Sequence, residues 1–424
     1  MEGRKAMDRI LRVLRTYHPL VWILVGGTAF ARTASFMSLP FLALYLSRTT
    51  GLDPFFTGTI VGAGALAGTF GGFIGGNLSD RFGRKRVMLS TLFVWAAVFW
   101  GFALAEEAAL FLMLNLLNGL CRSFFEPTGQ ALLADVTPPD KRMRVFGFRY
   151  MAINVGAAVG PLIGAYLGMV SGKITFWITG GAYLLYAVVL LITMNRFAPA
   201  APAAPPERTR FTAALRVIRK DAALGWFILG GILGQVGYAQ IESTLPLHLK
   251  TLFGENNALY PALLTLNAVT VILLQVLVTR WAEKRSLIGN LGLGCLLFGL
   301  GLGCFAIGEH WVVMMLGMFI LTIGEILTFP TSSLFIDRLA PESLRGTYFG
   351  ANSFRNVGFF IGPSLGGWLL GSHGGKTAFG LIALLTVCGV LFYWMGYRAW
   401  LQRKKAPEKE SVSNTSLSAA KAVR

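Results

Sequence analysis

The sequence predicts an all-α polytopic membrane protein in which twelve transmembrane helices form two pseudo-symmetric six-helix bundles. Three observations predict this fold class. Of the 424 residues, 54% are hydrophobic and 14% are charged, whereas about 25% of the residues of a soluble protein are charged. Twelve apolar runs reach or approach the roughly 20 residues with which a helix crosses a bilayer. A stretch rich in proline and alanine lies between the sixth and seventh runs and divides them into two equal sets.

Each apolar run is expected to form one span. We expect spans at about 19–46, 54–78, 86–106, 109–134, 143–170, 173–194, 221–249, 258–280, 286–307, 311–337, 345–371 and 375–399. The predicted bundles are therefore 19–194 and 221–399. Residues 195–220 are predicted to be a cytoplasmic linker, because their Pro/Ala tract cannot pack into a core. Residues 1–18 predict a cytoplasmic amphipathic helix, and residues 400–424 predict a disordered cytoplasmic tail.

Lysine and arginine are distributed unevenly between the two sides of the predicted membrane. With the N-terminus taken as cytoplasmic, 30 of them fall in cytoplasmic segments, four in the opposite loops and four inside apolar runs. This positive-inside pattern predicts a protein of the plasma membrane with both termini in the cytoplasm and in contact with anionic lipids. The net charge of +18 therefore reflects topology, and nucleic acid is not an expected partner.

The two halves of the chain repeat one another. A Pro-Thr pair in residues 126–137 recurs in 329–340, and the pattern Asn-Val-Gly-x-x-x-Gly-Pro-x-x-Gly of 154–164 recurs in 356–366. The offset between the copies is 202 to 203 residues. Two parallel repeats of six helices predict a substrate site between the halves, near the middle of the membrane.

The segment between the second and third spans reads Gly-Asn-Leu-Ser-Asp-Arg-Phe-Gly-Arg-Lys-Arg and begins at Gly76. Gly76 allows two helices to approach closely, and Gly83 permits a tight turn. Asp80 lies at the end of an apolar helix, where an unpaired charge is costly. Arg81, Arg84 and the two basic residues that follow are expected to hold the loop in the cytoplasm.

This segment closely resembles the signature loop of the major facilitator superfamily, Gly-x-Leu-(Ala/Ser)-Asp-Arg-x-Gly-Arg-(Arg/Lys), which joins that family's second and third helices. The resemblance implies a secondary transporter that works by alternating access. It also implies a cytoplasmic charge latch that holds the outward-facing state. The second-half loop, 280–284, keeps Glu283 as its one acid, so we expect the latch on the N-terminal half. Its expected residues are Gly76, Asp80, Arg81, Gly83, Arg84 and Asp135.

Small residues on the fifth span form a second motif. Gly156, Gly160, Pro161 and Gly164 predict a flat helix face for close backbone approach and a proline kink. The motif resembles the fifth-helix motif of major facilitator drug antiporters, Gly-x-x-x-Gly-Pro-x-x-Gly-Gly. Packing alone is the simpler interpretation of these glycines, whereas the resemblance implies an antiporter.

Ionisable side chains inside the spans are candidate functional residues, because a charge in the bilayer is costly unless it is paired or hydrated. They are Arg32, Arg122, Glu126, Arg149, Glu242, Glu325 and Arg355. Two arrangements stay open. In the first, Arg122 and Glu325, which correspond at the 203-residue offset, face the central cavity from opposite halves. In the second, Arg122 pairs with Glu126, four residues along the same helix, and Glu325 alone faces water.

Glu242 and Glu325 are the expected proton-carrying groups, with Arg122 and Glu126 as their coupling partners. Burial favours the neutral form of a carboxyl group, so such a group can bind and release a proton near physiological pH. The segments that begin at Glu242 and at Gly324 resemble the seventh and tenth helices of LmrP-type multidrug:proton antiporters. The loop 280–284 resembles that of MdtH-type transporters. These resemblances imply proton coupling and cationic drug binding.

The remaining arginines inside the spans, with nearby aromatic residues, are expected to line the substrate cavity. This set comprises Arg32, Phe36, Phe124, Phe125, Arg149, Tyr238 and Arg355. Helix packing is the alternative for each aromatic side chain. The four cysteines and four histidines show no metal-ligand spacing, and no phosphate-binding loop, Gly-x-Ser-x-Gly or His-Glu-x-x-His is present. We therefore expect neither a metal, a cofactor nor an enzyme.

The leading hypothesis is a proton-coupled exporter of amphipathic small molecules, a multidrug antiporter that works as a monomer by alternating access. The proton gradient is the expected energy source. One alternative is a transporter of a nutrient or organic anion, because arginines inside the spans can bind a carboxylate or phosphate. Another is a lipid or glycolipid flippase on the same fold.

Overall fold

The computed structural model describes residues 16–39, 42–51, 54–170, 172–197, 216, 219–254 and 259–422. Within these ranges the side chains of 43–44, 47–48, 54–59, 62, 65–66, 70, 165, 168–170, 172 and 404–422 are not described. The predicted N-terminal helix and most of the predicted linker lie outside the described residues.

Every regular element in the described ranges is a helix. The first half contains α2 (Pro19–Ser38), α3 (Leu42–Thr50), α4 (Pro54–Phe82), α5 (Arg84–Leu104), α6 (Ala108–Asp135), η2 (Pro139–Lys141), α7 (Arg142–Val170) and α8 (Gly172–Arg196). The second half contains α10 (Ala222–Glu242), α11 (Thr244–Phe253), α12 (Leu259–Ala282), α13 (Leu287–Ile307), α14 (Trp311–Leu339), η3 (Glu342–Leu344), α15 (Arg345–Ala351), η4 (Asn352–Asn356) and α16 (Val357–Ala422).

The lengths of these helices give twelve crossings, as predicted. Ten helical segments of the described residues are long and apolar enough to span a membrane. The last of them, Glu342–Arg403, has 62 residues and contains Gly374, whose φ of 77° is not helical. This glycine divides the segment into two spans. α4, with 29 residues, supplies the twelfth.

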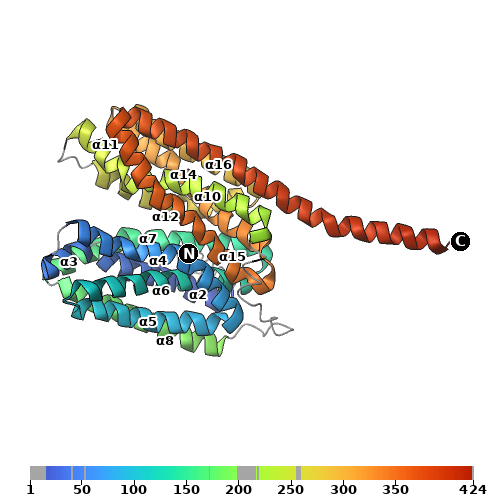
Figure 1. Ribbon diagram of the computed structural model, residues 1–424, viewed down its shortest axis with the longest axis horizontal. Coiled ribbons are helices and arrows are strands. Elements are labelled where there is room, and N and C mark those ends of the chain that lie inside the picture. Colours follow the sequence, from blue (N-terminus) through green and yellow to red (C-terminus); the bar gives the residue numbers. More distant parts are fainter. Residues whose placement is uncertain are drawn as a thin grey trace, which may run out of the picture.

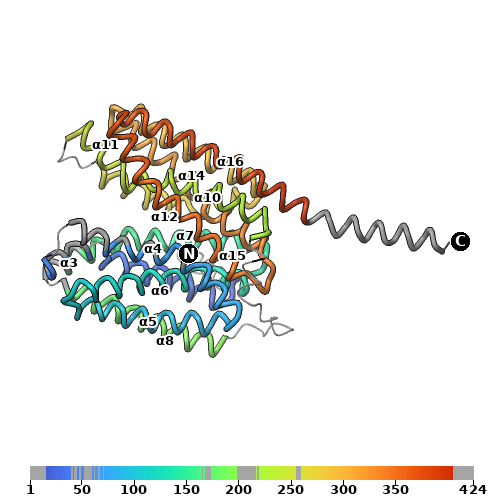
Figure 2. Tube along the Cα trace, viewed as in Figure 1, coloured from blue at the N-terminus to red at the C-terminus, as the bar shows by residue number. Residues whose placement is uncertain are grey.

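The helices form two bundles that lie side by side (Figure 1). Helices α2–α8 make one bundle and α10–α16 the other. In Figure 2 the blue to green first half of the chain lies in one bundle, and the yellow to red second half lies in the other. We call the end of the molecule where α4 turns into α5 the Gly83 end. α15 lies there, against α4 and α6 of the other bundle, and α7 packs on α12 and α14.

The bundles are closely packed at the Gly83 end. A Cβ atom at Gly76 would overlap the carbonyl group of Gly346, and one at Gly350 would overlap that of Gly72, so α4 and α15 touch backbone to backbone. One apolar core joins both bundles here, with the rings of Phe146 and Phe349 5.9 Å apart. The opposite end of the second bundle has its own separate apolar core.

Candidate functional site: charges between the bundles

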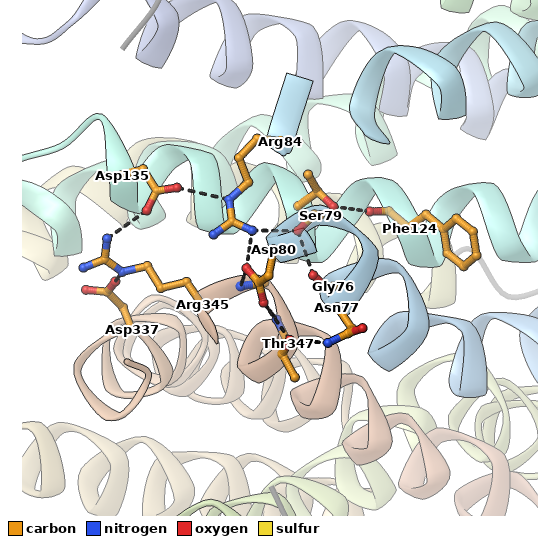
Figure 3. A network of polar contacts seen from close by, with 12 residues as sticks. Gly76, Asn77, Ser79, Asp80, Arg84, Phe124, Asp135, Asp337, Arg345 and Thr347 are labelled. Atoms are coloured by element: carbon orange, nitrogen blue, oxygen red, sulfur yellow. Dashed lines mark hydrogen bonds and ion pairs between the residues drawn. The ribbon is translucent and has the colours of Figure 1, made fainter. Parts of the chain in front are cut away.

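A carboxylate of the first bundle lies at the N-terminus of a helix in the second. α15 begins at Arg345, and the N–H groups of a first helical turn have no carbonyl partner within the helix. Asp80 accepts hydrogen bonds from the N–H groups of Gly346 (2.9 Å) and Thr347 (2.6 Å) and from the Thr347 hydroxyl (2.6 Å). Figure 3 shows Asp80 next to Thr347, and the side chain of Asp80 is 3% exposed. The helix dipole and these donors therefore stabilise a shielded negative charge.

Two arginines connect the neighbouring carboxylates in series (Figure 3). Arg84 pairs with Asp80, and its Nε lies 3.1 Å from Asp135 at the end of α6. Nη1 of Arg84 also donates to the hydroxyl of Ser79 at 2.7 Å. Arg345 approaches Asp135 from the second bundle, with a hydrogen bond of 2.8 Å. Asp135 therefore lies between one arginine of each bundle.

The series ends at Asp337, which is buried at the end of α14. Its Oδ1 lies 3.1 Å from Nε of Arg345, and its Oδ2 accepts a hydrogen bond of 2.7 Å from Arg142 of the first bundle. Acids and bases therefore alternate along the series, which crosses from one bundle to the other. We call this set the inter-bundle network: Asp80, Arg84, Asp135, Arg142, Asp337 and Arg345.

A second contact crosses the interface beside this network. Glu283, at the α12–α13 turn, accepts hydrogen bonds of 2.7 and 2.8 Å from Nε of Arg144 and of 2.7 Å from its Nη2. Glu283 follows Asp80 by 203 residues, so each half contributes an acid at the same place. The counterpart loop of the second half therefore adds a contact to those of Asp80, Arg84 and Asp135, which were expected from the N-terminal half.

The other predicted loop residues take different positions. Gly83 has a φ of 90°, which a glycine adopts without strain. Gly76 makes the close approach described above. Arg81 is exposed and lies over the ring of Phe82 at 5.2 Å, outside the inter-bundle network.

Sequence reasoning missed Arg142, Arg144, Asp337 and Arg345. The repeat contained a signal for them, because Asp135 and Asp337 are 202 residues apart and Arg142 and Arg345 are 203 apart. What the sequence lacked was the pairing, since each of these residues makes at least one ion pair with the other half.

Glu126 lies between two arginines inside the first bundle. One carboxylate oxygen accepts a hydrogen bond from Arg32 of α2 and the other from Arg149 of α7. All three side chains are largely buried. Glu126 makes no ion pair with Arg122, so the second of the two sequence-based arrangements is wrong.

Arg122 and Glu242 face the space between the bundles. Both side chains are exposed, although both residues lie in predicted spans. Neither has a hydrogen bond or ion pair with any described residue. The charge of Arg122 acts on Arg32 and, across the interface, on Glu242. Arg122 therefore lies within electrostatic range of a charge in each bundle.

Glu325 is fully buried within the second bundle. Its Oε2 accepts a hydrogen bond of 2.5 Å from Asn267 of α12, which also donates to Thr322 at 2.9 Å. Its Oε1 has no hydrogen-bond partner among the described residues. Glu325 therefore does not face a cavity with Arg122 in this structure, because its side chain is fully buried whereas Arg122 is exposed.

An aromatic cluster next to Glu325 crosses between the bundles. Tyr150 of α7 stacks on Phe329 of α14 with ring centroids 5.1 Å apart, and Tyr238 of α10 meets Phe329 edge-on at 5.6 Å. The guanidinium of Arg355 lies over Phe329 at 5.6 Å. Tyr238 and Arg355 therefore both lie against Phe329, and their place in a substrate cavity stays a prediction.

The other three predicted cavity aromatics pack within the first bundle. Phe125 is buried against Trp95 and Tyr186. Phe124 fills the space beside Gly75 of α4, and Phe36 lies against Gly160 of α7. The positions of all three agree with the alternative interpretation, which was helix packing.

The glycine motif of α7 also serves packing. A Cβ at Gly156 would meet Arg32 and Thr33 of α2. Its repeat copy packs in the same way, because Gly358 of α16 lies against Ile232 of α10. Pro161 lies inside α7, which continues past it to Val170.

Comparison with known proteins gives a consistent result. The family model described as Major Facilitator Superfamily matches residues 24–356. The transporter YqjV of Bacillus subtilis (strain 168), described as an uncharacterized MFS-type transporter, is 35% identical over 386 residues, which are 90% of this chain and 94% of that protein. A Na(+), Li(+), K(+)/H(+) antiporter of Planococcus maritimus is 29% identical over 80% of this chain and 86% of its own. Multidrug resistance protein MdtH of Yersinia pestis (strain Pestoides F) is 28% identical over 85% and 90%.

Solved structures show the same fold. The human organic anion transporter MFSD10 superposes with a TM-score of 0.70 at 18% identity, covering 88% of this chain and 98% of that one. The transporter FucP in the outward conformation gives a TM-score of 0.71 at 16% identity, over 89% and 98%.

Proposed function

Because the chain belongs to the major facilitator superfamily, we propose that it is a proton-coupled exporter of amphipathic small molecules that works by alternating access. Membership of that family makes it a multi-pass membrane transporter and not an enzyme. The names of two relatives, a cation/proton antiporter and a multidrug resistance protein, support proton-driven export. On this proposal the working unit is a monomer in the cell membrane, and the proton gradient supplies the energy without a cofactor.

The observation that carries the proposal is the inter-bundle network. It joins the two halves at the Gly83 end through acids and bases from both bundles. The positive-inside pattern assigns this end and both termini to the cytoplasm. A transporter closed there exposes its central site to the outside. Opening the network and closing the opposite end would give the second state of an alternating-access cycle.

Glu325 is the proposed proton carrier. Its fully buried side chain receives a hydrogen bond from Asn267, with the hydroxyls of Tyr150 and Tyr238 beside it, and protonation would remove a charge from the protein interior. Tyr150 of the first bundle borders the same site through Phe329. Gain or loss of the proton would therefore change the interface between the halves.

Arg122 and Glu242 are the proposed substrate-facing charges. Both are exposed and unpaired, so a polar group of the substrate can replace water at either without breaking an ion pair. Glu242 would bind the charged group of a cationic substrate, and Arg122 would bind that of an anionic substrate. Competition between substrate and proton for the carboxylates is what would drive export.

The test is efflux from proteoliposomes under an imposed pH gradient. Glu325→Gln should abolish gradient-driven efflux and leave downhill substrate exchange intact, because glutamine keeps the shape but cannot release a proton. Glu242→Gln should weaken binding of cationic dyes. Gradient-driven efflux that is unchanged in both variants would refute the proposed coupling.

A second candidate is the transport of organic anions, and the balance of charges inside the spans favours it. Apart from the buried Glu325, the spans contain four arginines and two glutamates. The arginines are Arg32, Arg122, Arg149 and Arg355, and the glutamates are Glu126 and Glu242. The structural similarity to an organic anion transporter adds support only at the level of fold. Thermal stabilisation by organic anions that is lost in Arg122→Gln, with no response to lipophilic cations, would select this candidate.

A further inference from the structure

A polar pocket opens between the bundles at the Gly83 end, where α7 faces α12. Its volume is about 120 Å³, which is room for several water molecules, since one needs about 10–15 Å³. Both bundles supply its walls, and the lining residues used below are Tyr17, Arg144, Gly147, Gln275, Thr279 and Arg280. Gly147 keeps the two helices close, because a Cβ there would lie 2.9 Å from the hydroxyl of Thr279.

The pocket contains two arginines, and one acid is paired with them. That acid, Glu283, binds Arg144. Arg280 is exposed and has no hydrogen bond or ion pair with a described residue. The ammonium group of Lys141 lies 5.9 Å from the ring of Tyr17. Burial raises the pKa of the Tyr17 hydroxyl, so this group stays protonated and can donate to an anion.

Aromatic residues around the pocket place it at the level of a membrane–water interface. Tyr17 meets Trp22 edge-on at 5.6 Å and Phe148 at 5.9 Å. On α12, the ring of Trp281 lies 3.9 Å beneath the guanidinium of Arg285. Tryptophan and tyrosine next to basic groups are typical of this depth in a bilayer.

An apolar surface leads away from the pocket along α12. Leu273 and Leu277 are 67% and 61% exposed. They lie three to seven residues before Arg280, which places them on adjoining faces of the same helix. A ligand that bound here would meet cationic donors at one end and hydrocarbon at the other.

We propose that this pocket binds the head group of an anionic phospholipid through its phosphate, with an acyl chain along Leu273 and Leu277. Guanidinium groups match the geometry of phosphate oxygens, and basic pockets between membrane helices suit anionic lipid heads. A choline head would find no free carboxylate here, because Glu283 is engaged by Arg144. Since Arg144 and Arg280 belong to different bundles, a bound lipid would also favour the state that is closed at the Gly83 end.

The experiment uses the full chain in detergent and compares two variants that lose the same charge at the same end. Arg280→Gln removes the free cation of the pocket. Arg338→Gln removes another exposed arginine, on α14, that does not line it. Dioleoyl phosphatidylglycerol should raise the melting temperature of the wild type and of Arg338→Gln more than dioleoyl phosphatidylcholine does. Arg280→Gln should bind phosphatidylglycerol about tenfold more weakly, the loss expected for one charge-assisted hydrogen bond.

A further arm titrates inorganic phosphate alone. Stabilisation by phosphate, with no additional effect of phosphatidylglycerol, would overturn the lipid as the ligand. Equal losses in Arg280→Gln and Arg338→Gln, or equal effects of the two lipids on the wild type, would overturn the site. Tyr17→Phe provides a second variant and should lower the affinity in the same direction as Arg280→Gln.

Discussion

The carboxylate of Asp80 in one bundle receives two hydrogen bonds from Thr347 in the other, one from its N–H and one from its hydroxyl, each 2.6 Å long. A helix N-terminus in one half of the molecule is thus capped by an acid of the other half. Separating the bundles leaves the first turn of α15 without its cap and leaves Asp80 with Arg84 as its remaining charged partner. This contact therefore gives the closed Gly83 end much of its stability, and it can be tested residue by residue.

Asp80→Asn should open the Gly83 end. Asparagine can still accept one hydrogen bond but loses the charge that interacts with the helix dipole and with Arg84, which is worth about 1–2 kcal/mol. The ratio of closed to open molecules should then fall about tenfold. Electron–electron distance measurements between spin labels at the exposed positions Arg86 and Arg338 report it directly. Arg81→Gln, which changes a charge outside the inter-bundle network, should leave the distance distribution unchanged.

Gly76→Ala should prevent full closure of the same end. The added Cβ would overlap the carbonyl group of Gly346, and backbone atoms at a helix–helix contact cannot move aside easily. Gly225→Ala is the matched control, because a Cβ there meets nothing within 4 Å. Both changes raise helix propensity by about 1 kcal/mol. We expect slowed transport and a shifted label distance for the first variant and wild-type behaviour for the second.

Exchange of the charges in the Arg144–Glu283 pair tests the second contact between the halves. Arg144→Glu alone should place two acids together and weaken closure, and Glu283→Arg alone should place two bases together. The double variant should recover most of the loss. The coupling should be about 1 kcal/mol, since Arg144 is 45% exposed and solvent screens such pairs. Losses that simply add in the double variant would show that the two side chains do not interact.

Glu126→Gln should destabilise the first bundle strongly. Removing this charge leaves Arg32 and Arg149 close together and unpaired, each with a side chain 13% exposed. Breaking a buried ion pair in this way costs about 3–5 kcal/mol. Thermal unfolding in detergent measures the loss. Glu242→Gln removes an exposed and unpaired acid, so a similar fall in its melting temperature would contradict the assignment.

Much of the architecture could be predicted from the sequence, because the constraints that a bilayer imposes act on each segment separately. Span length and the distribution of lysine and arginine are properties of single segments, and the twelve spans agree with the helices within a few residues for most of them. The turn at Gly83 and the close approach at Gly76 followed from residue type alone.

The pairing of charges did not follow in the same way. Arg122, Glu126, Glu242 and Glu325 all stood out as ionisable groups in apolar helices, but which two meet depends on how the bundles pack. The helix rotations place Arg32 and Arg149 against Glu126 and leave Arg122 exposed. The spacing of four residues permits an Arg122–Glu126 pair, but Glu126 pairs instead with Arg32 and Arg149 of two other helices.

Sharing of partners in the inter-bundle network has a kinetic consequence. Two ion pairs of the network cross between the bundles, Arg345–Asp135 and Arg142–Asp337, and they are linked because Arg345 also binds Asp337. A partly separated molecule that kept one crossing pair would carry a buried, incompletely paired ion at the other and would be rare. The passage between the two states should accordingly be a single activated step with one rate constant, and variants that weaken either crossing pair should speed it by a similar factor.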